Sequence, residues 1–549
     1  MCMYIIPLPV GSTRRFRSEQ AYRLIGLLFR TSRGPDLEES ATLRKSRIFA
    51  VATAVVLAVT PLAGCGGSTP GGVPDDTLTM ATASPIGSFD PVKFDIGPGK
   101  PYWQAVYDTL LRQDADRNII PGLAAAYSYD AAHTTLTLNL RKDIRFSDGA
   151  AFDANAAKAN LSRFTSTPGP NSAMGESITG IDAARPDQLI LHLSAPDPAL
   201  LPNLGSALGA MVSPDALSKG GFDRAPVGSG PYLYDPADSQ PGTVIFRRNS
   251  AYPDGSLYPF DRLELVALSD PNTIRNGLTT GRLDTGSFVS TDAAKLKAAG
   301  LSTIQMASGW NGLVLADRAG TVQPALGKPE VRQAINMVVD RDLFRTLAPG
   351  NPPATTQIFA PGSGAYEETL NSAYPHDIAK AKELMTRAGY PGGFAVTMPD
   401  MTSFTGSPAL NTALDMQLGT IGITVTWEKV PPQQLLTSMT SGRFPMFFMQ
   451  LGMKSSWEDL QLSVLPAATW NPFHATDPEL TALISTAQHA EPGSAQDAAF
   501  QAVNRRLVQS AWFAPIFGAE TVWASVAGVR IEQQERGYPD LVRFQRAGS

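Results

Sequence analysis

The stretch KPEVRQAINMVVDRDLFRTL, residues 328–347, carries the most regular helical pattern in the chain. Five apolar side chains share the spacing of one helix face: Val331, Ala334, Ile335, Val338 and Val339. A proline at the second position of the stretch can occupy the first helical turn, where its missing N–H costs nothing. The spacing predicts an amphipathic helix whose apolar side packs on a core.

The segments around this helix predict both helices and strands. HDIAKAKELMTRAGY, residues 376–390, predicts a second helix, which Asp377 caps and Gly389 ends. GITVTWEK, residues 422–429, alternates apolar and polar side chains, the period of a strand. Helices and strands that alternate in this way favour an α/β architecture.

The first part of the chain predicts the same mixture. DTLTMATA, residues 76–83, predicts a buried opening strand. TTLTLNL, residues 134–140, alternates leucines with polar residues and predicts a half-buried strand. Asp148 and Gly149 then form a turn, and Asp153 is placed to cap a following helix.

The composition indicates a folded chain of several domains. The 549 residues are 43% hydrophobic and 17% charged. After residue 64 the chain carries an excess of ten acidic side chains, whereas nucleic-acid binding needs a basic surface. No later segment has the length of a membrane span.

The two cysteines, Cys2 and Cys65, are too few for a disulfide framework or a structural zinc site. Cys65 follows three basic residues within 44–47, an apolar run over 48–59 and a group of small residues. This layout is typical of a secretory signal. We assign residues 1–64 to a leader and a lipoprotein signal peptide, and residues 65–75 to a flexible tether.

Leu62-Ala63-Gly64-Cys65 resembles the lipobox of bacterial lipoproteins. The resemblance implies that Cys65 is lipidated and becomes the mature N-terminus. Two or more acyl chains anchor a protein stably to a membrane where one does not. We therefore expect a body outside the cytoplasm, in the periplasm or the cell-wall space, tied to the cell membrane.

Nine blocks of sequence, in order, carry a wider resemblance. They are SFDPV at 88–92, VYDTLL at 106–111, IIPGLAAAYSYD at 119–130, LTLNLRKDIRFSDGAAFDA at 136–154, APVGSGPYLY at 225–234, FRRNSAY at 246–252, LTTGRLDTG at 278–286, KPEVRQAINMVVDRDLF at 328–344 and YPHDIAKAKELMTRAGY at 374–390. Together they resemble the dipeptide-, oligopeptide- and nickel-binding proteins of ABC transporters, family 5 of the extracellular solute-binding proteins.

The resemblance implies an α/β, periplasmic-binding-protein-like fold of class II, a two-lobed flytrap with an additional domain. Lobe I would combine residues 76–95, 221–310 and 516–549. The extra domain II would occupy 96–220, and lobe III 311–515. Crossover strands near Trp310–Leu315 and Ala514–Phe517 would form the hinge.

The implied function is capture of a peptide or peptide-like small solute in the cleft between lobes I and III and delivery to ABC permease subunits, by a monomer. A ligand that touches both lobes shifts the population toward the closed state. Two alternatives stay open: a non-peptide solute such as a metal chelate, and a lipoprotein sensor without transport.

The charged anchors of dipeptide binders are missing or displaced. An arginine usual after Met-Pro is absent from MPDMTSFTG, residues 398–406, and Met453 stands where the family has a tryptophan. Either a displaced carboxylate binds the ammonium group or the ligand is not a free dipeptide, since a buried ammonium needs a partner. The candidate binding residues are Trp310, Asn311, Asp400, Met453, Trp457, Glu458, Asp459 and Trp470.

Other classes find little support in the sequence. The five histidines are scattered without metal-ligand spacing, so we expect neither a directly bound metal nor a cofactor. The chain contains no G-x-S-x-G, H-E-x-x-H or P-loop motif. We therefore expect that the protein is not an enzyme.

Overall fold

The computed structural model describes residues 76–348, 350, 352–400, 402, 408–452, 455–534 and 537–548. Asp76–Ser549 form one compact unit. The leader, signal peptide and tether predicted over residues 1–75, including Cys65, lie outside the described residues, and so does Met453.

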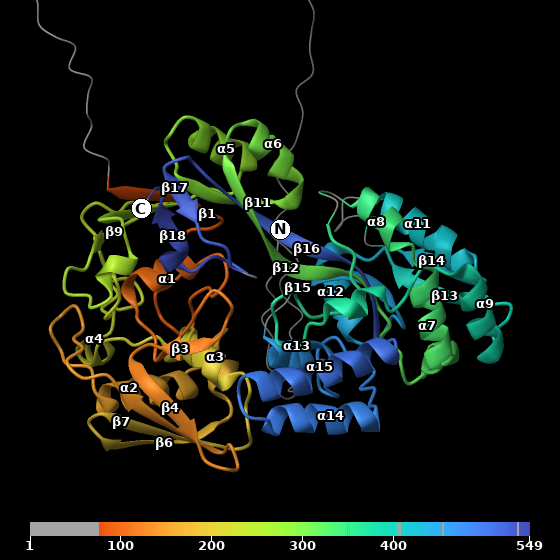
Figure 1. Ribbon diagram of the computed structural model, residues 1–549, viewed down its shortest axis with the longest axis horizontal. Coiled ribbons are helices and arrows are strands. Elements are labelled where there is room, and N and C mark those ends of the chain that lie inside the picture. Colours follow the sequence, from red (N-terminus) through yellow and green to blue (C-terminus); the bar gives the residue numbers. More distant parts are fainter. Residues whose placement is uncertain are drawn as a thin grey trace, which may run out of the picture. The chain divides into compact units, whose positions relative to one another are not determined.

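An eight-stranded sheet runs through the described chain in the order β15-β12-β16-β11-β1-β10-β9-β8 (Figure 1). Its strands are β1 Thr77–Thr82, β8 Tyr232–Tyr234, β9 Thr243–Arg248, β10 Arg262–Ala267, β11 Thr285–Val289, β12 Ser302–Val314, β15 Phe447–Gly452 and β16 Phe513–Ser525. The predicted opening strand is confirmed as β1, which lies parallel between β10 and β11. This interior position explains why its apolar side chains are buried.

The two longest strands, β12 and β16, pair antiparallel along their whole length. The second half of β12 also pairs with β15, so these strands join the sheet to the chain between 311 and 515. Both predicted crossover segments lie in this pairing, with Trp310 opposite Gly518 and Leu313 opposite Ala514. Bulges interrupt β12 at two glycines, Gly309 and Gly312, where a Cβ would collide with a neighbouring carbonyl. Movement about these strands stays a prediction.

A separate four-stranded antiparallel sheet has the order β4-β5-β7-β6. Its strands are β4 Ala124–Tyr129, β5 Thr135–Leu140, β6 Ile178–Arg185 and β7 Gln188–Leu193. The predicted strand is confirmed as β5, with its three leucines buried. The helix after Asp153 is α2, Ala154–Ser166, and the Asp153 side chain accepts a hydrogen bond from the backbone N–H of Ala156.

The prediction of one continuous helix over residues 328–347 is wrong. The structure has α7, Pro329–Val338, and α8, Arg341–Leu347. Val339 is extended, and the Asp340 side chain accepts a hydrogen bond from the backbone N–H of Leu343. An aspartate that caps a new helix therefore ends the apolar repeat, although Val339 is itself buried.

The remaining elements of this part agree with the predictions. The second helix is α9, Ile378–Arg387, and Asp377 caps it through the backbone N–H of Lys380. β13, Phe394–Pro399, pairs in parallel with β14, Ile423–Glu428, which confirms the strand predicted over 422–429. Helices that follow are α11 Pro408–Gly419, α12 Pro432–Thr440, α13 Ser456–Ser463, α14 Pro478–His489 and α15 Ser494–Gln509.

The other helices and strands are α1 Lys100–Val106, β2 Leu111–Gln113, β3 Ile119–Pro121, α3 Leu200–Leu204, α4 Pro214–Lys219, α5 Pro271–Thr279, α6 Ala293–Ala298, β17 Val529–Ile531 and β18 Phe544–Arg546. In Figure 1, α14 and α15 lie side by side, and α5 and α6 lie against β11 and β12. In the described part of the chain, no helix combines the length and the apolar character needed to cross a bilayer.

The buried apolar side chains form separate clusters. One consists of residues between 310 and 517 with a single addition, Ala199. A second joins β1, β10 and the C-terminal strands to the four-stranded sheet and its helix α2. A third lies under α5 and α6. The lobe and domain boundaries stay a prediction, and Ala199 identifies where the predicted domain II packs against the predicted lobe III.

Candidate solute-binding site

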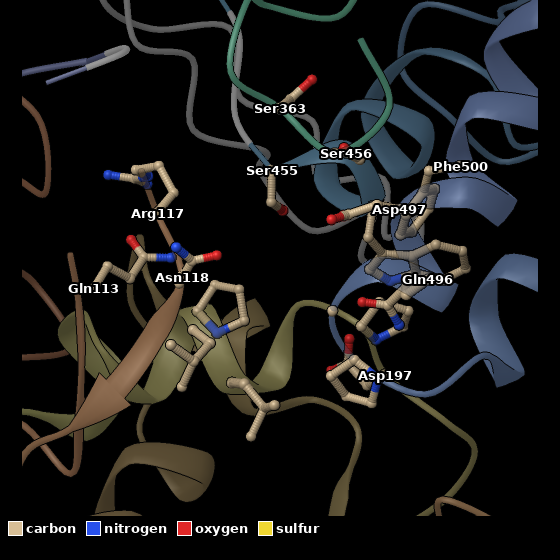
Figure 2. Close-up of a pocket in the computed structure, with 18 of the residues that line it drawn as sticks. Gln113, Arg117, Asn118, Asp197, Ser363, Ser455, Ser456, Gln496, Asp497 and Phe500 are labelled. Atoms are coloured by element: carbon tan, nitrogen blue, oxygen red, sulfur yellow. The ribbon is translucent and has the colours of Figure 1, made fainter. Parts of the chain in front are cut away.

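A cavity of about 570 Å³ lies where these two parts meet. Its first wall consists of the turn between β2 and β3, the end of β4 and the loop before α3. Its second wall consists of residues 362–366, the start of α13 and the start of α15. Figure 2 shows Gln113, Arg117 and Asn118 on the first wall and Gln496, Asp497 and Phe500 on the second. Segments that are distant in sequence therefore enclose one space.

The β2–β3 turn holds its shape through Asp114. The Asp114 carboxylate accepts hydrogen bonds from the backbone N–H of Asn118, at 2.8 Å, and from its side-chain amide, at 3.0 Å. Arg117 occupies the left-handed region, with φ of 67°. This turn places three polar side chains against the cavity.

A half-buried carboxylate, Asp197, lies on the first wall of the cavity, before α3. It accepts hydrogen bonds from the Ser177 hydroxyl at 2.7 Å and from the backbone N–H of Ala199 at 3.0 Å. Burial raises the pKa of the Asp197 carboxyl above its usual value in spite of these two donors, and the charge of Glu458 acts in the same direction. The negative charge of Glu458, on the second wall, thus acts on the Asp197 carboxyl of the first wall.

The start of α13 contributes Ser455, Ser456 and Trp457. Ser455 is the N-cap and forms a capping box with Glu458: its hydroxyl donates to the Glu458 carboxylate at 2.6 Å and its backbone N–H at 3.1 Å. Trp457 is buried and forms part of the cavity wall. A helix start with polar caps and one large ring therefore faces the space.

α15 brings Gln496, Asp497 and Phe500 to the same wall. The Asp497 carboxylate lies against Gly364, where a Cβ would collide with it. Desolvation raises the pKa of the Asp497 carboxyl above its usual value. In Figure 2 this carboxylate points toward the β2–β3 side of the cavity.

The two walls touch at one end of the cavity. His133 Nε2 lies 2.9 Å from the Glu491 carboxylate, and the ring of His133 stacks on Tyr129. The Gln488 amide donates to the carbonyl of Pro196 at 2.8 Å. These contacts hold the start of the 488–500 segment against the first wall.

Among the described candidates from the sequence, Trp457 alone lines this cavity. Trp310 is buried against Phe513, with ring centroids 5.5 Å apart, and Trp470 is buried against Phe447 at 6.0 Å. Both rings belong to the core between 310 and 517. The structure places them as packing residues, and a contact with solute stays a prediction.

The polar candidates are dispersed. Asn311 is buried in β12 beside a bulge. Asp400 follows β13 and accepts hydrogen bonds from the Thr402 N–H and the Asn411 amide, both at 2.9 Å. The hydrogen bonds from Thr402 lower the pKa of the Asp400 carboxyl. Glu458 belongs to the capping box, and Asp459 is buried in α13.

The residues that the sequence analysis missed are Arg117, Asp197 and Asp497. Each lies in a different segment, and no spacing in the chain connects them. One local signal was present: a turn of the form DADRN between two short apolar segments, at 114–118. Among the described residues, no group of three His, Cys, Asp or Glu side chains is placed to hold a metal ion.

Comparison with known proteins identifies related chains. The glutathione-binding protein GsiB of Salmonella paratyphi A is 28% identical over 351 residues, which cover 63% of this chain and 68% of the relative. The same protein of Escherichia coli K12 is 27% identical over 351 residues, with the same coverage of 63% and 68%.

Solved structures share the fold. The open form of the periplasmic murein tripeptide binding protein MppA has a TM-score of 0.76 at 17% identity, covering 86% of this chain and 98% of the other. HbpA2 of Haemophilus parasuis has a TM-score of 0.76 at 17% identity, with 86% and 99% covered. DppA of Helicobacter pylori in complex with the peptide STSA has a TM-score of 0.65 at 20% identity, with 86% and 98% covered.

These likenesses confirm the predicted periplasmic-binding-protein-like α/β fold. Residues 118–471 match the family described as bacterial extracellular solute-binding proteins, family 5. The matched range is more than half of the chain. It includes most of both cavity walls, but not the cavity residues before 118 on the first wall or the 488–500 segment on the second. The chain belongs to family 5 of the bacterial extracellular solute-binding proteins.

Proposed function

We propose that this protein captures a peptide or peptide-like small solute in the cavity between its two walls and delivers it to the permease of an ABC importer. Lipid on Cys65 keeps the folded body at the outer face of the cell membrane, and the protein works as a monomer. It binds its solute without chemical turnover, as its relatives are binding proteins and not enzymes.

The cavity itself carries the proposal. A volume of about 570 Å³ suits a small solute, and the lining combines rings such as Trp457 and Phe500 with polar and charged groups. Its walls come from the parts assigned above to domain II and lobe III, and not from lobes I and III, between which the resemblance implies the ligand. A solute that contacts both walls stabilises the arrangement in which they are close.

The named ligands of similar proteins support a peptide-like solute. They include glutathione, a murein tripeptide and the peptide STSA. A metal chelate is a second candidate, because the Brucella suis NikA and Campylobacter jejuni NikZ structures hold Fe(III)-EDTA and Ni(L-His). Each of these two chelates carries its own organic groups, through which a protein can recognise it.

Native mass spectrometry of the full chain, purified gently in detergent, tests the proposal. We expect one small, non-covalently bound solute per chain, which leaves on mild activation and whose fragments include amino-acid residues. A chelate would be recognised by its metal isotope pattern. A chain that carries no solute and shows no thermal shift with glutathione, di-, tri- or tetrapeptides would contradict the peptide-like solute.

The anchor has its own measurement. Cys65→Ser is expected to abolish incorporation of a labelled fatty acid and to move the protein from the membrane fraction to the aqueous fraction. Retention of the Cys65→Ser protein on membranes would refute the lipid anchor and leave the binding proposal intact.

A further inference from the structure

Arg117 has a backbone conformation that side chains rarely adopt. Its φ of 67° lies in the left-handed region, where a glycine is the usual residue in a turn. An arginine there is less stable than a glycine by about 1 kcal/mol, so this choice calls for a functional reason. The hydrogen bonds of the turn come from Asp114 and Asn118 and make no use of the Arg117 side chain.

The guanidinium of Arg117 has no acceptor within the described residues. Its Nε is buried without a hydrogen-bond partner, and no carboxylate lies within ion-pair distance of the group. The charge of Arg117 acts on the Asp540 carboxylate, but that group already accepts from Lys100 and Gln104, both at 2.5 Å. Arg117 therefore keeps its donors for something outside the chain.

The charges around this guanidinium are mixed. Lys100 adds positive charge at this end, and Asp116, which is exposed, also lines the cavity. Asp116 is not within ion-pair distance of Arg117 in the described structure. The positive donors of Arg117 thus remain available on the first wall.

The second wall carries the opposite charge. No hydrogen bond or ion pair within the described residues involves the Asp497 carboxylate, and this group lines the same cavity. A half-buried cation, whose Nε is buried without a partner, lies on one side, and an exposed carboxylate lies on the other. Together they fit a solute that carries both signs of charge. Arginine is also the side chain best suited to bind a carboxylate through two parallel hydrogen bonds.

We propose that Arg117 is the residue of this cavity that recognises an anionic group of the solute, a carboxylate, with Asp497 receiving a cationic group at the opposite wall. The inference rests on the proposed function, and it deepens it, since it assigns the solute's polarity and its orientation.

A library of tetrapeptides in two equimolar forms, with a free C-terminal carboxylate or a C-terminal amide, tests this assignment. The detergent-solubilised full chain is incubated with the mixture, separated from unbound peptide, and its bound peptides are quantified by mass spectrometry. We expect the wild type to enrich the free acids about tenfold or more, since a charge-assisted bidentate contact is lost in the amide. Arg117→Gln and Arg117→Gly are expected to bring this enrichment close to one.

Two further variants separate recognition from folding. Arg117→Lys is expected to retain part of the preference, because it keeps the charge without the fork of donors. Arg185→Gln is the matched control: this β6 side chain is 62% exposed, and it does not line the cavity. The Tm of each unliganded protein shows whether it folds, and Arg117→Gly is expected to melt at or above the wild-type temperature.

Each possible result of this experiment either supports or contradicts the assignment of Arg117. Free acids and amides bound equally by the wild type, or an unchanged preference in folded Arg117→Gln, would overturn the assignment of Arg117 and leave solute capture standing. Capture of neither form would overturn the peptide-like solute, and this inference with it. A tenfold preference that Arg117→Gln removes and Arg185→Gln keeps supports the assignment.

Discussion

Near the start of β16, Arg332 and Arg341 lie buried in the core and donate to backbone carbonyls, whereas on the cavity wall the Nε of Arg117 is buried without a partner. Arg341 donates five hydrogen bonds, which go to the carbonyls of Thr355, Pro515, Asn336 and Tyr374 and to the Asn336 side chain. Arg332 donates to three carbonyls, those of Ala511, Leu326 and Ser510. Burial lowers the pKa of both Arg332 and Arg341 to about 10.

The comparison teaches how the same side chain serves two purposes. In the core, a guanidinium fixes the loop that leads into β16 by satisfying backbone carbonyls, without a carboxylate in contact. At the cavity, the hydrogen bonds of the turn around Arg117 are made without its guanidinium. The variants described next test how the side chains of each region contribute to stability and to solute binding.

The largest effect is expected for Arg341→Met. Removing this guanidinium leaves four buried carbonyls and one amide oxygen without their donor, and each unsatisfied buried group is costly. We expect the free energy of unfolding to fall by at least about 3 kcal/mol. Urea titration followed by circular dichroism measures it. Arg345→Met, at a partly exposed position of the same helix, α8, is the control. An equal loss of stability in both variants would show that the buried position of Arg341 carries no extra cost.

Trp457→Ala is expected to weaken solute binding at least tenfold, about 1.4 kcal/mol, while the protein stays folded. This ring is the sequence-predicted aromatic residue that lines the cavity. Isothermal titration with the co-purified solute measures the affinity, and Trp427→Ala, in β14 away from the cavity, serves as the control. Wild-type affinity in Trp457→Ala would mean that the solute lies elsewhere.

Arg117→Gly is expected to keep or increase stability, by up to about 1 kcal/mol, because glycine accepts the positive φ without strain. The measurement is the urea midpoint of the unliganded protein. This change in the free energy of unfolding has the opposite sign to the change expected for Arg341→Met. A clear loss of stability would place Arg117 with the structural arginines.

The smallest effect is expected for Asp197→Asn, which changes how the stability of the protein depends on pH. The folded-state pKa of Asp197 is raised by burial, so the folded protein binds this proton more tightly than the unfolded chain. The wild type therefore loses stability as pH rises from about 4 through that raised pKa, while the amide carries no such charge. The stability of Asp197→Asn relative to the wild type is expected to rise over this window in urea titrations at several pH values. A constant difference from pH 4 to pH 7 would contradict the raised pKa.

Much of the secondary structure could be predicted because its signals are local. Asp153 and Asp377 were expected to cap helices, and each accepts a hydrogen bond from the backbone N–H three residues on. The same chemistry at Asp340 was overlooked, because the apolar repeat continues past it and conceals the new cap. The prediction over 328–347 was therefore right that the segment is helical and wrong about where the first helix ends.

The binding site could be predicted only in part. Trp457 lines the cavity, and its contact with solute stays a prediction, whereas Trp310 and Trp470 have the same residue type and lie in the core. Glu458 was a candidate for a ligand ammonium group, and the capping box with Ser455 gives it a structural partner. Side-chain chemistry alone does not distinguish a ring in a cavity from a ring in a core.

The sequence by itself determined the types of most elements, the helix caps, the resemblance to the family and the expected export signal. These features depend on neighbours within a few residues or on the nine blocks of sequence that carry the family resemblance. Three features became visible only in the folded chain: Arg117 and Asp497 line one cavity, the half-buried Asp197 lies in its wall, and Arg341 donates hydrogen bonds to backbone carbonyls. The physical reason is that burial, charge pairing and unused donors depend on which distant segments pack together, and no local pattern records that packing.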